Sequence, residues 1–329
     1  MARETATCYT FCMAAIALSP LLIPRRKRRF VRETPEPFQL TERDVSLVGH
    51  VAHYRFLRST HLSELCQAPH KKVCDRLTFL FHAGYLDRPR AQFEHYREGG
   101  GSSPMVYALA NRGAQLLIER HGPDVPDVDW ARKNDQAGRQ FIQHTLAIAE
   151  VRVALQRAIR VRPGFQLLEP RQLLEMAPAE TRRRERPWTL RAKVRHNDAA
   201  IEFGVAPDYA FAIQYPDGRF RAFLVECDRG TMPVDRANLQ QTSLKRKFLA
   251  YTAAKRAGLH QHHFGWKTFR VLLVTTNAQR AGNALASIGE YVHDHGRGLF
   301  LIADRQSLAT ADIIAYPWRD ALGQAKALV

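Results

Sequence analysis

Apolar residues recur at helical spacing in three successive segments in the first third of the chain. Thr41 and Asp44 have the spacing of a capping box at the start of the first segment, and Gly84 follows the last one. Beyond Gly84, two strand-like runs flank a Gly- and Ser-rich stretch. The predicted elements are helices that begin at 41, at 59 or 60 and after 69, strands at 85–88 and 105–109, and a helix at 110–120.

Three helices followed by a hairpin predict a winged helix-turn-helix over residues 41–121, whose third helix enters the major groove of double-stranded DNA. The polar face of that helix lies opposite its apolar stripe, and basic residues of the hairpin can reach phosphates. The side chains expected at DNA are Lys71, Lys72, Asp75, Arg76, Thr78 and His82 on the helix, and Arg88, Arg90, His95 and Arg97 on the hairpin. The alternative is that the same unit binds another protein.

A second pattern begins after residues 122–135, a stretch with two prolines and four aspartates that we interpret as an interdomain linker. The elements predicted beyond it are a long helix at 136–160, a strand at 165–168, a hairpin within 206–231, a helix at 238–257, a strand at 269–275, a helix at 280–293 and a strand at 299–302. Residues 182–198 form a polar insertion with an Arg-rich exposed loop. The pattern therefore predicts an α/β domain over residues 136–329.

The hairpin within 206–231 places acidic side chains where a buried strand is expected. Pro216, Asp217 and Gly218 are a strong turn signal between two β-rich runs. If these three residues are the whole loop, the numbers of paired residues sum to 434 and Asp208 lies directly opposite Glu226. Opposite residues have Cβ atoms about 5 Å apart, so the two carboxylates repel each other.

A divalent cation is the simplest compensation for this repulsion, because Mg²⁺ is commonly held by one or two carboxylates with waters and phosphate oxygens. Period-two alternation places Asp228 on the same face as Glu226. Glu150 lies on the mostly apolar long helix, where a carboxylate needs a partner or a metal. The alternative is a hairpin at the edge of the sheet whose carboxylates pair with nearby arginines.

Composition adds one strong constraint, which is charge. The chain of 329 residues has 49 Lys and Arg against 32 Asp and Glu, a net charge of +17. Such an excess indicates a polyanionic partner, most simply nucleic acid. No basic amphipathic helix dominates the sequence, so we expect no membrane partner. The five cysteines lack a Cys-x-x-Cys pair, which favours reduced thiols and a cytoplasmic protein.

Residues 1–40 are interpreted as a disordered basic leader with an arginine-rich run at 25–29. The apolar stretch at 11–23 is too short for a comfortable transmembrane helix. The sequence has no P-loop, no Rossmann glycine pattern and no serine-centred elbow, so nucleotide hydrolysis and acyl transfer have no support.

Two resemblances follow from these residues. Pro207-Asp208 and Glu226-Cys227-Asp228 resemble the motif of the PD-(D/E)XK nuclease superfamily, except that Asp228 stands where that superfamily has lysine. Residues 41–320 resemble the replication-relaxation family of plasmids and integrative elements. The second resemblance rests on Ala83-Gly84-Tyr85-Leu86, Tyr107-Ala108-Leu109 with Gly113, Pro207-Asp208 and Glu226-Cys227-Asp228-Arg229-Gly230-Thr231.

The nuclease resemblance implies that Asp208 and Glu226, with Glu150 as a further ligand, bind Mg²⁺ or Mn²⁺ that activates a water. Lys245 or Arg229 would then substitute for the missing lysine. The candidate catalytic residues are Asp208, Glu226, Asp228 and Lys245.

Three functions are compatible with the sequence. The first is a DNA-binding accessory protein of plasmid or mobile-element replication, relaxation or mobilisation, with a relaxase or replication protein as partner and a weakly active or inactive nuclease-like domain. The second is an active metal-dependent endonuclease or nickase targeted by the winged helix. The third is a winged-helix transcriptional regulator.

Overall fold

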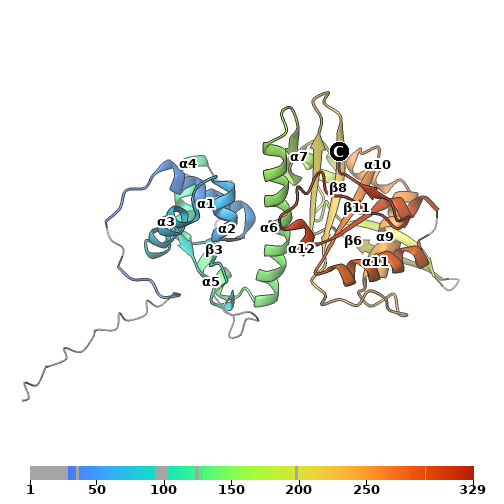
Figure 1. The fold of residues 1–329 in the computed structure, drawn as a ribbon, viewed down its shortest axis with the longest axis horizontal. Coiled ribbons are helices and arrows are strands. Elements are labelled where there is room, and N and C mark those ends of the chain that lie inside the picture. The colour runs from blue at the N-terminus through green and yellow to red at the C-terminus, as the bar shows by residue number, and fades with distance from the viewer. Residues whose placement is uncertain are drawn as a thin grey trace, which may run out of the picture. The chain divides into compact units, whose positions relative to one another are not determined.

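The computed structural model describes residues 29–34, 37–92, 103–122, 126, 128–196, 199–292 and 294–329. Residues 32–329 form one compact unit. The fold of this unit mixes α-helices with parallel and antiparallel β-sheet (Figure 1). Residues 1–28, with the arginine-rich run of the predicted leader, lie outside the described residues.

The first part of this unit contains helices packed on a small sheet. Its elements are α1 (Glu42–Tyr54), β1 (Phe56–Arg58), α2 (Ser59–Leu65), α3 (His70–His82), β2 (Leu86–Asp87), η1 (Arg90–Gln92), β3 (Val106–Leu109) and α4 (Asn111–His121). The predicted capping box is confirmed, because Thr41 N donates to Asp44 Oδ2 at 2.8 Å and Asp44 N donates to Thr41 Oγ1. The sheet has the order β1-β3-β2, and β1 was not foreseen because it follows α1 after one residue.

The described end of the predicted leader packs on α3. Arg32 Nε donates to the Phe81 carbonyl oxygen at 2.9 Å, and the rings of Phe38 and Phe79 stack with centroids 5.8 Å apart. Hydrogen bonding and aromatic contact therefore order residues that composition alone assigned to a disordered segment.

The predicted linker contains a helix, α5 (Trp130–Asp135). Asp129 caps it by accepting from Arg132 N, and the Trp130 side chain is buried in the core of the first part. Burial of so large a ring stabilises an ordered connection. Both prolines and three of the four aspartates that suggested a linker precede this tryptophan.

One long helix, α6 (Arg139–Arg160), is shared by both parts of the unit. Ala149 and Val153 lie in the core of the first part, whereas Val151 and Leu155 pack against the large sheet. Figure 1 shows α6 standing between the two. A helix with apolar residues on several faces is stable when it is covered on several faces.

The large sheet has the strand order β12-β11-β10-β9-β8-β7-β4. Its strands are β4 (Gln166–Leu168), β7 (Tyr209–Gln214), β8 (Phe220–Cys227), β9 (Phe269–Thr275), β10 (Phe300–Asp304), β11 (Trp318–Arg319) and β12 (Ala325–Lys326). The β8, β9 and β10 strands are mutually parallel, and β9 is the doubly buried strand that its continuous apolar run predicts.

Helices cover both faces of this sheet. On the face opposite α6 lie α9 (Leu244–Arg256) and α11 (Ala278–Tyr291), which share a core with alternate residues of β8 and β9. The remaining elements are α7 (Pro170–Glu175), α8 (Ala179–Arg182), α10 (Leu259–Phe264), η2 (Asp294–Leu299) and α12 (Arg305–Leu308).

The polar insertion predicted at 182–198 contains the first strand of a β-hairpin, β5 (Leu190–His196). The second strand, β6 (Ala199–Val205), follows the predicted insertion and pairs antiparallel with β5. Leu190, Ala192 and Val194 alternate with polar residues and bury one face of the hairpin against α9. The charged residues between them concealed this period-two pattern in the sequence.

We expect Gly113→Ala to lower the free energy of unfolding by about 1–3 kcal/mol, the usual cost of forcing an atom into a packed site. A Cβ atom at this helical glycine would lie 2.1 Å from the Tyr85 carbonyl oxygen. The matched control is Gly282→Ala on α11, where a Cβ atom meets nothing within 4 Å. The control should be neutral or gain about 0.5–1 kcal/mol, as measured by denaturant unfolding. Equal stability of the two variants would contradict the close approach at Gly113.

Candidate functional site

The predicted register of the acidic hairpin is confirmed. Tyr209 pairs with Val225 and Gln214 with Phe220, and the turn closes where Tyr215 N donates to Arg219 O at 2.8 Å. Asp208 N donates to Val225 O at 2.9 Å, which continues the ladder by one residue. Asp208 therefore lies opposite Glu226, at the carboxyl end of β8.

Asp208 is held as a carboxylate by groups from two elements. Its Oδ2 accepts from Cys227 N at 2.8 Å, and its Oδ1 lies 3.1 Å from His144 Nε2 on α6. Burial opposes ionisation of Asp208, but the hydrogen bond to His144 and the charge of Lys247 outweigh it and lower the pKa of this carboxyl below its ordinary value. Asp208 is therefore ionised at neutral pH.

Glu226 is 3% exposed and faces α9. Its Oε1 accepts from the Tyr251 hydroxyl at 2.6 Å, and its Oε2 accepts from Lys247 Nζ. Burial raises the pKa of Glu226 to about 7, although the charge of Lys247 acts in the opposite direction. For Lys247, burial disfavours the charged form, but the nearby carboxylates of Glu226 and Asp208 outweigh it and raise its pKa.

These groups open into one cavity of about 460 Å³, which we call the carboxylate cavity. Its chemistry-bearing lining residues are His144, Asp208, Glu226, Asp228, Arg229 and Lys247. Three carboxylates, an ammonium, a guanidinium and an imidazole therefore share a single solvent-accessible space. Such a mixture can bind a cation, contact a phosphate and move a proton.

The structure does not bring Lys245 to these carboxylates. Lys245 Nζ lies 3.1 Å from Asp235 Oδ1 and 3.5 Å from the centroid of the Tyr291 ring. Lys247, two residues later, points in nearly the opposite direction because each helical residue turns the side chain by about 100°. The signal was present in the sequence, since Lys247 shares the helical face of Leu244 and Tyr251.

Glu150, the predicted third metal ligand, binds arginines. Its carboxylate pairs with Arg58 at the end of β1 and with Arg305 at the start of α12. The side chain of α6 that contacts Asp208 is instead His144. Sequence analysis missed this role because it did not fix which face of α6 meets the acidic hairpin.

Asp228, which stands at the position of the superfamily's lysine, is paired with Arg280 of α11. Arg280 Nη2 donates to Asp228 Oδ1 at 3.0 Å, and Arg280 Nε donates to the other carboxylate oxygen. A bidentate pair of this kind neutralises the carboxylate. The negative charge that replaces lysine is therefore compensated from the neighbouring helix.

Asp208 and Glu226 fit an oxygen-preferring cation such as Mg²⁺ or Mn²⁺ by donor chemistry, since every carboxylate oxygen has a second lone pair beyond its present partner. Within the described residues, no group of three His, Cys, Asp or Glu side chains is arranged to hold a metal ion. A metal here would therefore take two protein carboxylates and complete its shell with waters and phosphate oxygens.

The predicted DNA-contacting residues fall into two sets. Lys71, Lys72 and Thr78 are exposed on α3, and Arg90 is exposed on η1. Arg76 is engaged inside the fold, because its Nε donates to the buried Asp44 carboxylate at 2.9 Å. His95 and Arg97 lie outside the described residues.

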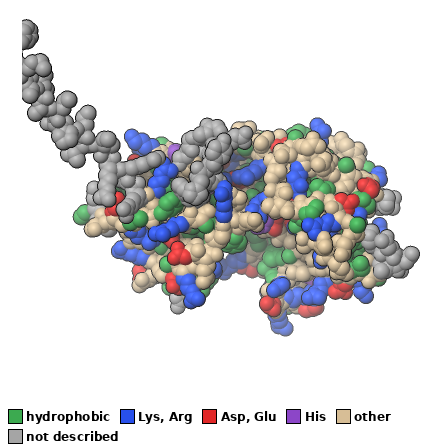
Figure 2. Space-filling model, turned by 90° about the horizontal axis from the view of Figure 1, so that it is seen from below, with side chains coloured by type: hydrophobic (Ala, Val, Ile, Leu, Met, Phe, Trp, Pro, Cys, Tyr) green, Lys and Arg blue, Asp and Glu red, His purple; other side chains and the backbone are tan. Residues whose placement is uncertain are grey.

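Arg88 joins the hairpin to α3. Its Nη2 donates to the Thr78 hydroxyl at 3.2 Å and to the Tyr107 hydroxyl at 3.1 Å. His82 Nδ1 accepts from Glu33 N at 2.9 Å, so the leader covers the end of the predicted reading face. Figure 2 shows Lys and Arg side chains at many separate places on the face that it presents.

No helix within the described residues is long and apolar enough to cross a membrane. Residues 48–268 match the model of a family described as Replication-relaxation. Searches of curated proteins and of solved structures found no match.

We expect Glu226→Gln to change how stability depends on pH. Because the pKa of Glu226 is raised from 4.5 to about 7 in the folded chain, its protonated form stabilises the fold, and this contribution is lost as the pH rises from about 4.5 through about 7. The variant should remove a decline of up to about 3 kcal/mol, measured by denaturant unfolding between pH 5 and 8. Glu202→Gln, at an exposed residue of β6, is the control. An unchanged profile for Glu226→Gln would rule out this titration.

Proposed function

The chain belongs to the replication-relaxation family, and from this premise we propose that it binds double-stranded DNA in the replication, relaxation or mobilisation of a plasmid or other mobile element. The observation that carries the proposal is the exposed pair Lys71 and Lys72 at the start of α3. This helix is the third of the first part and is followed by the paired strands β2 and β3, the order of a winged helix-turn-helix.

The surroundings of α3 support the same use. Val73, Leu77 and Leu80 are buried and fix the opposite face, so Lys71 and Lys72 are directed outward. A net charge of +17 favours association with a polyanion at long range. Phosphate contacts by lysines position a helix on the duplex, whereas sequence recognition needs contacts to bases.

We expect Lys71→Ala and Lys72→Ala each to weaken binding to duplex DNA and to reduce the slope of log K against log salt by up to about 0.9 per lost phosphate contact. Binding is measured by fluorescence anisotropy at salt concentrations from about 50 to about 200 mM, a range over which phosphate contacts change the affinity strongly. Lys193→Ala, at an exposed lysine of β5, is the matched control. Slopes that are unchanged in all three variants would place the DNA contacts outside α3.

Metal-dependent cleavage of DNA is a second candidate function. The observation that favours it is the convergence of Asp208, Glu226 and Lys247 on one cavity. Lys247 can supply from α9 the positive charge that the motif position of Asp228 lacks. A bound Mg²⁺ or Mn²⁺, held by Asp208 and Glu226, would supply an activated water and stabilise charge on a phosphodiester.

The residues of this chain would have distinct parts in such a reaction. Lys247 would contact a phosphate oxygen, and Tyr251 would keep the Glu226 carboxylate oriented through its hydroxyl. His144 Nε2 lies 3.1 Å from Asp208 Oδ1 and would help to hold that carboxylate in place. Pairing of Glu226 with Lys247 and of Asp228 with Arg280 neutralises both acids without metal, which favours weak or absent cleavage over rapid turnover.

Incubation of the protein with supercoiled plasmid DNA and Mg²⁺ or Mn²⁺ distinguishes an active cleavage centre from an inactive one. If the centre cleaves, Asp208→Asn and Glu226→Gln should abolish nicking, and Lys247→Ala should reduce it by about 10²–10³-fold, the usual effect of losing one charge-stabilising group. Lys245→Ala is the matched control, because Lys245 contacts Asp235 and Tyr291 instead. Nicking that survives Asp208→Asn and Glu226→Gln would exclude this centre as its source.

A further inference from the structure

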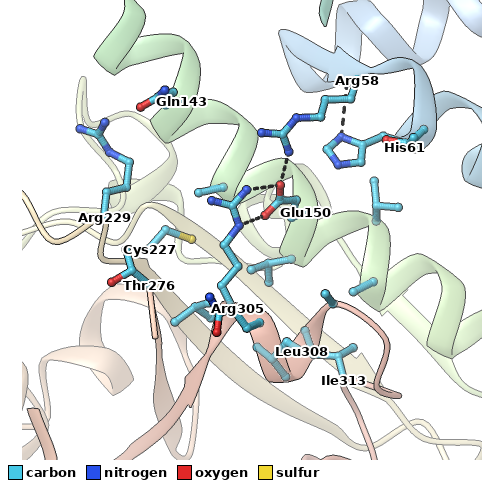
Figure 3. Close-up of a pocket in the computed structure, with 18 of the residues that line it drawn as sticks. Arg58, His61, Gln143, Glu150, Cys227, Arg229, Thr276, Arg305, Leu308 and Ile313 are labelled. Carbon is cyan, nitrogen blue, oxygen red and sulfur yellow. Dashed lines mark hydrogen bonds and ion pairs between the residues drawn. The ribbon is translucent and has the colours of Figure 1, made fainter. Parts of the chain in front are cut away.

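A second and larger cavity, of about 830 Å³, lies between α6 and the carboxyl ends of the parallel strands β8 and β9. Residues of α2 and α12 complete its wall (Figure 3). Ligands of open α/β sheets bind outside the carboxyl ends of the strands. We call this space the arginine cavity, because Arg58, Arg157, Arg229 and Arg305 line it.

Positive charge is in excess in the arginine cavity. Among the described residues that line it, four arginines face three carboxylates, Glu64, Glu150 and Asp228. Glu150 binds both Arg58 and Arg305, and Asp228 is already neutralised by Arg280, which is not part of the lining. Anions are therefore favoured over cations in this space.

Arg229 is the lining arginine that does not take part in these ion pairs. It is half-buried and lines both the arginine cavity and the carboxylate cavity. Among the described residues it has no hydrogen-bond or ion-pair partner. Figure 3 shows it beside Gln143, apart from the cluster formed by Arg58, Glu150 and Arg305. A partly desolvated guanidinium with its five donors free is suited to a phosphate.

Apolar side chains also line the arginine cavity. They include Ala147, Val151, Ala154, Val274, Leu308 and Ile313. A ligand that combines an anionic group with a less polar body matches such a lining, and a nucleotide has this composition. The volume of about 830 Å³ lies in the usual range of 300–1,000 Å³ for small-molecule sites.

The two cavities meet along one short segment, because Cys227, Asp228 and Arg229 line both. We propose that the arginine cavity binds the phosphate group of a nucleotide through Arg229, with Arg305 as a further arginine of the lining. The source of this phosphate is either a DNA strand that continues from the carboxylate cavity or a free nucleotide. The first source rests on the proposed action on DNA, and the second does not.

The experiment uses the full chain and a labelled, 5′-phosphorylated hexathymidylate, which is single-stranded and has no duplex for α3 to bind. Anisotropy at 0.1 M salt should show a loss of roughly tenfold in affinity for Arg229→Ala, since a charge-assisted contact is removed. The slope of log K against log salt should fall by about 0.7, the value for one phosphate of a single strand. Arg191→Ala, at an exposed arginine of β5, is the matched control and should bind within about twofold of wild type.

Competition distinguishes the two sources. Displacement of the labelled strand by thymidine 5′-monophosphate at comparable concentration would assign the site to a free nucleotide, whereas displacement by unlabelled hexathymidylate alone would assign it to a strand. The proposal is overturned if Arg229→Ala binds the labelled strand as wild type does, or if Arg191→Ala loses as much affinity.

Two controls keep this result separate from folding and from duplex binding. Because Arg229 has no partner among the described residues, Arg229→Ala should keep the wild-type melting temperature. Lys71→Ala should retain the affinity for hexathymidylate even where it loses duplex affinity. A loss of duplex binding alone in Lys71→Ala would test the proposed function of α3. A loss of binding to the short strand alone in Arg229→Ala would test the proposed phosphate site in the arginine cavity.

Discussion

Two carboxylates on one rung of an antiparallel strand pair are the constraint around which the second part of the fold is arranged. Because Asp208 and Glu226 lie opposite each other, each needs its own compensation. Asp208 takes it from the backbone and from α6, whereas Glu226 takes it from Lys247 and Tyr251 on α9. One rung therefore recruits helices from both faces of the sheet, and loss of Lys247 would leave the Glu226 carboxylate buried without its counter-ion.

The same principle extends to the other acids at this edge of the sheet. Asp228 is matched by Arg280, and Glu150 by two arginines from opposite sides. These acids are therefore matched by arginine side chains of the chain itself. Arg229 contrasts with them, because it has no hydrogen-bond or ion-pair partner among the described residues.

The sequence was sufficient for features that depend on neighbouring residues. The turn at Pro216 and the period-two pattern of the strands predicted the pairing of Asp208 with Glu226, and capping predicted the start of α1. The hairpin β5–β6 was missed because charged residues interrupt its short apolar alternation. Local signals of this kind succeed where the pattern is unbroken.

Contacts between distant segments were beyond the reach of the sequence. Glu150 was assigned to a metal because the sequence showed only the apolar helix on which it lies. The arginines that pair with it, Arg58 and Arg305, come from segments 92 and 155 residues away. Lys245 was named as a candidate, whereas Lys247 in the same basic run was not considered, and the choice depends on which face of α9 lies on the sheet. Tertiary packing, not propensity, decides such questions.

Sharing of α6 between the two parts has a mechanical consequence. The helix of 22 residues is about 33 Å long, and its side chains are clamped into the cores on both sides. The first part of the fold, which contains α3, is therefore not joined to the sheet by a flexible linker. Any displacement of one part against the other has to bend α6 or slide it past close-packed side chains. A movement at α3 is therefore transmitted to the neighbourhood of His144 and Asp208 through a stiff connection.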